Sequence, residues 1–169
     1  TGYIPKPGDM KYKDLNNDHK IDQYDVAAIG YPVYPLLTGG INLGFSYKGF
    51  DFSMTWSGAT KVSRLLDDIF REPFGATDSR SLMKYMIDDM WTPEKGNSAK
   101  APAISFTNKV NNYRDSDLWL RDASYLRLKN VEIGYNFPKK ILSKINIGSL
   151  RVFATGYNLL TLDKLKIVD

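Results

Sequence analysis

Two stretches of the chain alternate strictly between large apolar and small or polar residues. They run from Gly40 to Lys48 and from Phe50 to Ser57, and the turn signal Lys48-Gly49 separates them. A period of two predicts an amphipathic antiparallel β-hairpin with a very short connection. One predicted face of the hairpin is apolar and consists of Ile41, Leu43, Phe45, Phe50, Phe52, Met54 and Trp56. The opposite face is polar and includes Asn42, Ser46, Asp51, Ser53 and Thr55.

Strand patterns return in the last third of the chain. We predict a short strand at 118–121 and two long strands, one over 125–137 and one over 150–160. In the first long strand, Leu126 and Leu128 share one phase of the alternation, whereas Val131 and Ile133 share the other. Such a flip predicts a β-bulge near Lys129-Asn130. The basic segment 139–147 between the long strands is short enough for one helical turn.

The segment 58–118 follows a different pattern and is expected to be a long excursion between strands. Apolar residues at helical spacing predict a helix near 61–72, which Pro73 would stop. A second helix is predicted near 79–91, with Asp78 or Ser79 as its N-cap. The residues expected to be buried in this segment are Leu65, Leu66, Ile69, Phe70, Leu82 and Met86.

The apolar hairpin face allows two fold classes. It is the core of a soluble β-sandwich, or it faces lipid in an outer-membrane barrel whose lumen the polar face lines. The 169 residues fit one domain of ordinary size and contain no run of about 18 apolar residues that would make a transmembrane helix. Transmembrane β-strands need only about 9–11 residues, so the alternation leaves both readings open.

The composition narrows the chemistry that the chain can perform. It has no Cys, which rules out disulfides, Cys-ligated zinc, iron–sulfur clusters and a Cys nucleophile. A single His disfavours a His-rich metal site or a catalytic triad, so we assign no catalytic residues and do not expect an enzyme. The net charge of +4 comes from scattered Lys and Arg, which gives little support to nucleic-acid binding.

The segment 14–25 has the spacing of a twelve-residue calcium loop. Oxygen-bearing side chains occupy its first, third, fifth, ninth and twelfth places, and the seventh residue offers its backbone carbonyl. The predicted ligands are Asp14, Asn16, Asp18, the carbonyl of Lys20, Asp22 and Asp25. His19 stands at the sixth place, where Gly usually permits a sharp turn, and His tolerates the left-handed conformation needed there. We predict structural Ca²⁺, and the alternative is an acidic surface turn without metal.

Several segments resemble the C-terminal part of SusC/RagA-type TonB-linked outer-membrane transporters. They are 7–22, Ile29-Gly30, 47–51, 151–153 and 156–161, and the most specific is the run Trp119-Leu120-Arg121-Asp122-Ala123-Ser124-Tyr125-Leu126-Arg127-Leu128-Lys129-Asn130-Val131-Glu132-Ile133-Gly134-Tyr135. The order and spacing of the segments match as well. The commonest form of the acidic segment in that family has Gly where this chain has His19. Because the chain lacks an initiating Met and a signal peptide, we expect a piece of a longer protein.

The resemblance implies long antiparallel strands in a large β-barrel of about 22 strands, in the outer membrane of a Gram-negative bacterium. It implies import of oligosaccharides (glycans) or peptides, a SusD-like surface lipoprotein as partner, and a plug and TonB-contacting regions outside this chain. Residues 1–38 would then be an extracellular segment with the calcium loop, 39–57 a barrel hairpin, 58–118 an extracellular loop with helices, and 119–169 two further strands with a periplasmic turn. The alternative function is a soluble calcium-stabilised β-rich module that binds carbohydrate or acts in adhesion.

Overall fold

A computed structural model of the chain describes residues 4–74, 81–104 and 109–165. The chain forms two compact units. One contains Thr1–Gly30 and Arg64–Arg121, and we call it the loop unit. The other contains Tyr31–Ser63 and Asp122–Asp169, and we call it the sheet unit. Each unit is described separately below.

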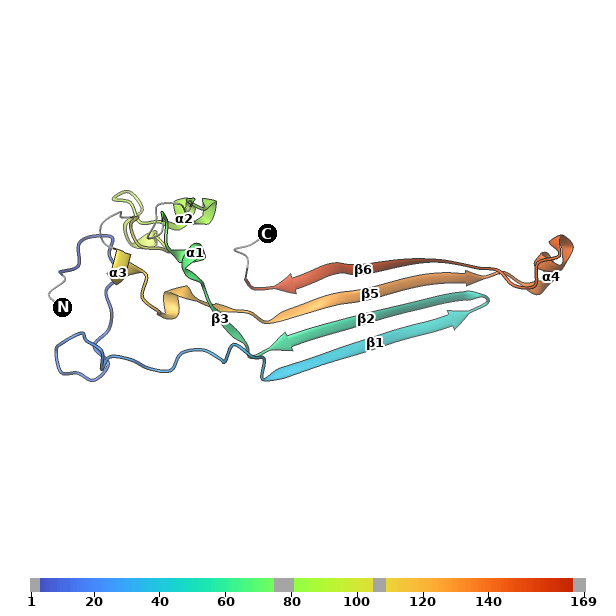
Figure 1. The fold of residues 1–169 in the computed structure, drawn as a ribbon, viewed down its shortest axis with the longest axis horizontal. Helices are drawn as coiled ribbons and strands as arrows, with labels where there is room; N and C mark the ends of the chain where they lie inside the picture. The colour runs from blue at the N-terminus through green and yellow to red at the C-terminus, as the bar shows by residue number, and fades with distance from the viewer. Residues whose placement is uncertain (1–3, 75–80, 105–108, 166–169) are drawn as a thin grey trace. The chain divides into compact units, whose positions relative to one another are not determined.

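The sheet unit is built on four long antiparallel strands, drawn side by side in Figure 1. Their order is β1, β2, β5, β6, with bounds Leu37–Tyr47, Phe50–Thr60, Tyr125–Asn136 and Arg151–Asp163. The register pairs Ile41 with Trp56, Leu43 with Met54 and Phe45 with Phe52. Directly opposed residues of an antiparallel pair share a face, so the predicted apolar and polar faces of the hairpin are confirmed.

The hairpin connection is a two-residue turn. Lys48 and Gly49 both have positive φ, at 47° and 92°, which is the combination that joins right-twisted strands most tightly. A side chain on Gly49 would also meet the carbonyl oxygen of Asn136 at 2.7 Å. The turn therefore requires Gly at this position, and the predicted short connection is confirmed.

The predicted bulge in the third long strand is present. The pairing of β5 with β6 shifts between Leu128 and Asn130, and the pairing of β2 with β5 shifts opposite the same point, between Thr55 and Trp56. One extra residue in β5 returns Leu126 and Leu128 to the face that carries the apolar residues after the bulge. The sheet thus keeps one continuous apolar face despite the phase flip in the sequence.

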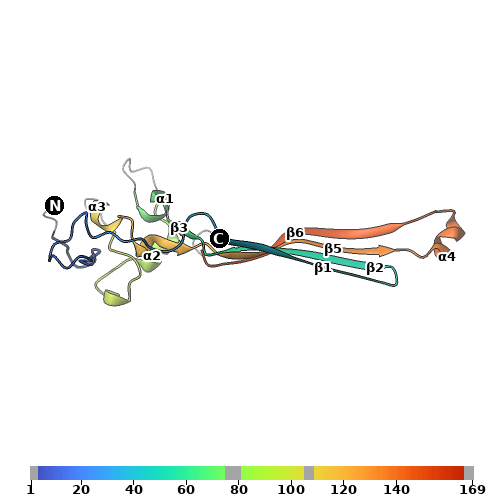
Figure 2. The same cartoon turned by 90° about the horizontal axis from the view of Figure 1, so that it is seen from below.

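A short basic connection joins β5 to β6. It contains α4 (Lys139–Leu142) and the 3₁₀ turn η3 (Ser143–Ile145), which confirms the expected helical turn. Both views show α4 beyond the ends of β5 and β6 (Figures 1 and 2). Leu142 is almost completely buried, so this connection has an apolar anchor of its own.

Helical structure in the segment 58–118 is shorter than the sequence predicts. The helix expected over 61–72 is wrong for most of its length, because β3 (Ser63–Leu65) is a strand and only α1 (Asp68–Arg71) is helical. β3 pairs with β4 (Leu120–Asp122), and the amide of Leu66 donates to the carbonyl of Trp119. These long-range backbone partners outweigh the helical spacing of the apolar residues.

The second predicted helix is also shorter, since α2 covers only Lys84–Asp89. Asp78 and Ser79, the predicted caps, lie outside the described residues; the residue at the observed N-cap is Met83, which makes no capping side-chain hydrogen bond. The remaining helices are η1 (Gly96–Ser98), α3 (Lys109–Asn112) and η2 (Asp117–Trp119). Within the described part of the chain, no helix has both the length and the apolar character needed to cross a membrane.

The apolar core of the loop unit is small. Leu66 and Met86 are buried as predicted, together with Tyr113 and Trp119. Leu65, Phe70 and Leu82 are only partly buried. The prediction for Ile69 is wrong, because this side chain is 51% exposed on the four-residue helix α1.

Candidate functional site

The acidic loop 14–25 has the backbone that its sequence predicts. Its fourth and sixth residues, Asn17 and His19, have φ values of 62° and 64°. The left-handed conformation expected at His19 is therefore present, at a residue type that tolerates it. The loop therefore turns sharply at these two residues.

Backbone amides of the loop donate to its carboxylates. Asp14 accepts from Asn17 and His19 at 2.6 and 2.8 Å, and Asp18 accepts from Lys20 at 2.8 Å. Asp25 closes the loop, because its two oxygens accept from the amides of Leu15 and Asp22 at 2.7 and 2.8 Å. These amides, that of Asp22 first, lower the pKa of Asp25.

The donor chemistry of the loop suits a hard divalent cation, because the predicted ligands are all oxygen atoms. Among the residues that the structure describes, however, no three acidic or His side chains are gathered as they would be around a metal ion. The carboxylates are turned toward backbone amides, as the hydrogen bonds above show. Ca²⁺ and the ligand set Asp14, Asn16, Asp18, Lys20, Asp22 and Asp25 therefore stay predictions.

The polar face of the sheet carries a charged cluster that the sequence reasoning missed. Arg151 at the start of β6 forms ion pairs with both Asp51 on β2 and Glu132 on β5. Asn136 adds a 2.9 Å hydrogen bond from its Nδ2 to Oδ1 of Asp51. Gly134 lies beneath the cluster, and a Cβ there would stand 2.5 Å from Oδ2 of Asp51. No local sequence signal links residues 100 positions apart, as Asp51 and Arg151 are.

The apolar face of the sheet is open. Ile41, Phe45, Ile133 and Val152, one or more from each of three strands, expose between 53% and 62% of their surface. A soluble domain rarely leaves so large a contiguous apolar surface uncovered. This face is the strongest indication of the environment in which the sheet functions.

Aromatic rings gather on this face at the end of the sheet next to the hairpin turn. The rings of Phe50 and Tyr135 lie 4.5 Å apart, and those of Tyr135 and Phe137 lie 5.0 Å apart. Tyr47 is paired with Phe50 in the register and is itself exposed. Clusters of this kind are typical of the boundary between apolar membrane and water.

The loop unit contains three aromatic residues on which a sugar could stack, Trp91, Tyr113 and Trp119, and two of them are buried. Tyr113 and Trp119 are buried against each other, with ring centroids 5.9 Å apart. Burial, and to a lesser extent Glu72, raises the pKa of Tyr113 to about 12. Trp91 is half-buried and lines a surface groove with Met10 and Leu118.

Comparison with known proteins identifies the family of this chain. No protein-family model matches the chain. TonB-dependent receptor P3 of Formosa agariphila is 31% identical over 156 residues, which are 92% of this chain and 14% of the receptor. TonB-dependent receptor P26 of the same organism is 30% identical over 165 residues, 96% of this chain and 16% of the receptor. The chain belongs to the TonB-dependent transporters.

Solved structures place this transporter segment in the SusC/RagA-type group. The RagAB peptide importer in its open-open state matches with a TM-score of 0.64 at 25% identity, over 87% of this chain and 16% of that one. Its closed-closed state matches with the same TM-score at 26% identity, over 86% of this chain and 16% of that one. The transporter segment thus spans about one sixth of the length of its relatives. These relatives are named as receptors and importers and not as enzymes, in line with the lack of an assigned catalytic residue.

Proposed function

We propose that the protein is an outer-membrane nutrient importer and that the sheet unit forms part of its barrel wall. The apolar face of β1, β2, β5 and β6 would contact lipid, and the polar face would line the lumen of a barrel of about 22 strands. The single observation that carries this proposal is the open apolar face of the sheet. The relatives named as TonB-dependent receptors support it.

The dimensions of the strands agree with this proposal. The four strands contain 11, 11, 12 and 13 residues, and a tilted transmembrane strand needs about 9–11. The cluster of Phe50, Tyr135 and Phe137 would then mark one membrane boundary. The ion pairs of Arg151 lie on the polar face, where water in the lumen can solvate them.

The topology of the sheet suggests an orientation in the membrane. Barrels of this kind have short periplasmic turns and long extracellular loops. Lys48-Gly49 and 138–148 would therefore be periplasmic, and the loop unit extracellular. We propose that a SusD-like lipoprotein caps the extracellular side, and that a plug and TonB-contacting regions lie outside this chain. The related RagAB structures are of an importer whose cargo is peptide.

The cargo is an oligosaccharide (glycan) or a peptide, and the two classes are separated by transport measurements. The full-length protein is expressed with a SusD-like lipoprotein in a Gram-negative host that lacks other importers for these compounds. The cells are supplied with labelled oligosaccharides and peptides. We expect TonB-dependent accumulation of one class. Failure of both classes, with the protein correctly inserted in the outer membrane, would contradict the importer proposal.

The second candidate function is a soluble calcium-stabilised carbohydrate-binding or adhesion module. It requires a cover over the apolar sheet face, and the described residues provide none for Ile41, Phe45 or Val152. Recovery of the full-length protein in the soluble fraction, without detergent, would favour this function over the importer.

We propose further that the loop 14–25 binds structural Ca²⁺ through Asp14, Asn16, Asp18, the Lys20 carbonyl and Asp22 or Asp25. The left-handed residues Asn17 and His19 support this reading. Calorimetric titration of the chelated full-length protein tests it. Asp18→Ala should remove the heat of Ca²⁺ binding, whereas Asp67→Ala, at an exposed carboxylate outside the loop, should leave it unchanged. Equal heats in both variants would leave only the surface-turn reading.

A further inference from the structure

The loop unit contains a surface groove with an indole ring in its lining. The volume of the groove is about 340 Å³, which lies in the range of about 300–1,000 Å³ that is typical of small-molecule sites. The side chains that give the groove its chemistry are those of Trp91, Asp9, Asn97 and Lys100. All the lining residues belong to the loop unit, so the groove is a feature of this unit alone.

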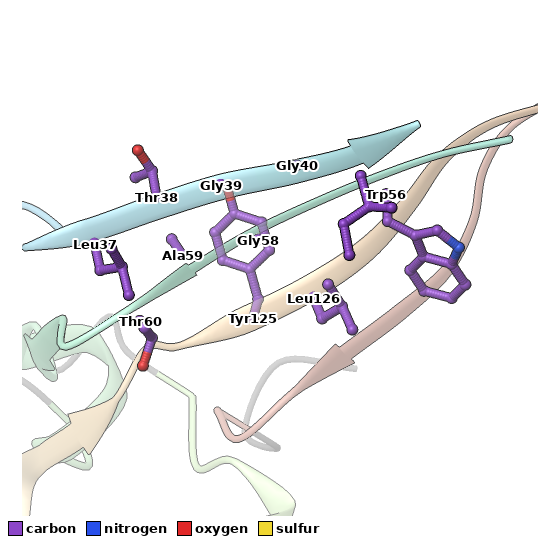
Figure 3. Close-up of a pocket in the computed structure, with 11 residues that line it drawn as sticks. Leu37, Thr38, Gly39, Gly40, Trp56, Gly58, Ala59, Thr60, Tyr125 and Leu126 are labelled. Carbon is purple, nitrogen blue, oxygen red and sulfur yellow. The ribbon is translucent and has the colours of Figure 1, made fainter. Parts of the chain in front are cut away.

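The sheet unit has a larger hollow of different chemistry. Its volume is about 450 Å³, and Figure 3 shows a lining of mainly apolar side chains and glycines, among them Leu37, Trp56 and Leu126. Among the described residues that line this hollow, none is charged and none has an amide side chain. A polar ligand would find few partners there, whereas the groove of the loop unit offers a carboxylate, a carboxamide and an ammonium group beside an aromatic ring.

The backbone of the loop unit fixes Trp91 in the groove. The amide of Trp91 donates to the carbonyl of Ala101 at 2.9 Å, and the preceding residue, Met90, forms a parallel β-bridge with Ala101. A Cβ on Gly8 would stand 2.7 Å from Cε3 of the indole, so only glycine, here with φ of 93°, lets the chain lie this close to the ring. The ring is therefore in place before a ligand arrives, which lowers the ordering cost of binding.

Polar groups of both hydrogen-bonding types line the groove together with the ring. The carboxylate of Asp9 is oriented by the amide of Lys6 at 2.7 Å and by Nδ2 of Asn112 at 3.0 Å, and an ionised carboxylate has acceptor capacity beyond two hydrogen bonds. The carboxamide of Asn97 is exposed and makes no hydrogen bond within the described residues. The ammonium group of Lys100 is 3.9 Å from its carboxylate partner, too far for a direct hydrogen bond. Asn97 and Lys100 can therefore donate to a ligand, and Asn97 can also accept.

These groups match the surface of an uncharged sugar. A sugar ring has a face of C–H groups that packs against an aromatic ring, and its hydroxyls both donate and accept hydrogen bonds. The opposite charges of Asp9 and Lys100 nearly cancel, so a strongly anionic or cationic ligand gains little from the groove. A peptide that adds as a strand needs unpaired backbone amides, but those of Met10, Trp91 and Ala101 already donate within the loop unit. The groove therefore favours an uncharged oligosaccharide over a peptide.

We propose that this groove binds an uncharged oligosaccharide, with one sugar ring stacked on Trp91 and its hydroxyls bonded to Asn97 and Lys100. The inference rests on the proposed function, which puts the loop unit outside the cell and leaves the class of cargo open. It assigns the cargo to the oligosaccharides, and it makes the groove a site that captures the cargo before it enters the barrel.

The test measures binding of defined sugars to the full-length protein in detergent. Isothermal titration calorimetry is run with cellohexaose, maltohexaose, laminarihexaose, xylohexaose and mannohexaose, and with tryptic peptides of casein as the peptide probe. Asn97→Ala removes an exposed carboxamide from the lining. Gln23→Ala is the matched control, because Gln23 carries an exposed carboxamide of the same unit that does not line the groove. Trp91→Ala removes the indole, and Trp91→Phe keeps an aromatic ring at this position.

We expect the wild type to bind at least one of the hexasaccharides. Asn97→Ala should weaken this binding about fivefold through the loss of a hydrogen bond, and Trp91→Ala should weaken it by roughly tenfold or more. Trp91→Phe should recover part of the loss, and Gln23→Ala should bind like the wild type. Binding within about twofold of the wild type in both Asn97→Ala and Trp91→Ala overturns the inference, as does a wild type that binds none of the hexasaccharides.

A different result refutes the proposed function. A full-length protein that is absent from the outer membrane, or that is inserted there and accumulates neither sugar nor peptide, is not a nutrient importer, whatever its groove binds. Accumulation of peptides by an inserted protein that binds none of the hexasaccharides keeps the importer and overturns the inference.

Discussion

Replacing Asn112 with Ala should loosen the segment around Met10 from the rest of the loop unit. Asn112 is completely buried. Its Oδ1 accepts from the amide of Met10 at 2.8 Å, and its Nδ2 donates to Oδ1 of Asp9 at 3.0 Å. These two hydrogen bonds join segments that are more than 100 residues apart in the sequence. Asn112→Ala removes both while leaving the backbone carbonyl that accepts from Trp119.

The free-energy cost of Asn112→Ala is estimated from the two hydrogen bonds that it removes. A buried donor without an acceptor costs about 1–3 kcal/mol, and a hydrogen bond to a carboxylate contributes about 1.5–3 kcal/mol. Met10 is only half-buried, so water can replace part of the lost hydrogen bond to its amide. We therefore expect Asn112→Ala to destabilise the local structure around Met10 by about 2–3 kcal/mol. Such a change should lower the protection of the Met10 amide against hydrogen exchange roughly 30–150-fold.

Hydrogen exchange of the full-length protein, followed by mass spectrometry of the peptide that contains Met10, measures this protection. Asn112→Asp keeps the acceptor for Met10 but puts a second carboxylate beside Asp9, so it should also lose protection near neutral pH. Asn97→Ala, at an exposed position of the same unit, is the control and should behave like the wild type. Protection within twofold of the wild type in Asn112→Ala would refute the reasoning.

Two further predictions concern charged groups of the sheet unit. Gly134→Ala places a Cβ 2.5 Å from Oδ2 of Asp51 and 2.6 Å from Nη2 of Arg151, so the ion-pair cluster must shift. We expect the folded protein to lose about 1–3 kcal/mol of stability. An unchanged denaturation midpoint would contradict this prediction. At the other end of the sheet, hydrogen bonds from Ser124 and Lys164 lower the pKa of Asp122, and Asp122 raises the pKa of Lys164. A lowered carboxyl pKa contributes stability above about pH 4 that is lost on acidification, and a raised lysine pKa contributes stability below about pH 10 that is lost at higher pH. Protection of the Ser124 amide should therefore exceed that in Asp122→Asn near pH 7, and the excess should shrink as the pH falls further below 4. Equal protection of this amide in the two proteins at pH 7 would count against the pairing.

The sequence predicts the sheet better than it predicts the loop unit, because the two depend on different kinds of information. Alternation, the Lys48-Gly49 turn and the phase flip at Lys129 are local signals, and each corresponds to a strand, a turn or a bulge in the structure. The helix expected over 61–72 is wrong because residues 63–65 form β3, which pairs with β4. β4 lies more than 50 residues later in the sequence, so the local hydrophobic pattern contains no information about this pairing.

In the candidate sites, too, features set by local sequence were predictable and features set by long-range contacts were not. The left-handed backbone at His19 was predictable, because the spacing of the acidic loop puts a sharp turn at this residue. The gathering of its carboxylates around a metal ion stays a prediction, because the described residues show no such group. The cluster of Asp51, Glu132 and Arg151 is invisible in the sequence, since its members come from three strands.

The most direct test of the barrel-wall proposal is to measure which face of the sheet contacts lipid. Nitroxide labels are placed singly at Leu43 and Met54, on the apolar face, and at Asn42 and Ser53, on the polar face, in the full-length protein reconstituted in bilayers. The account predicts high accessibility to oxygen and low accessibility to a water-soluble nickel complex at Leu43 and Met54, with the reverse at Asn42 and Ser53. Equal accessibility at all four positions, or greater nickel accessibility at Leu43 and Met54, would contradict it.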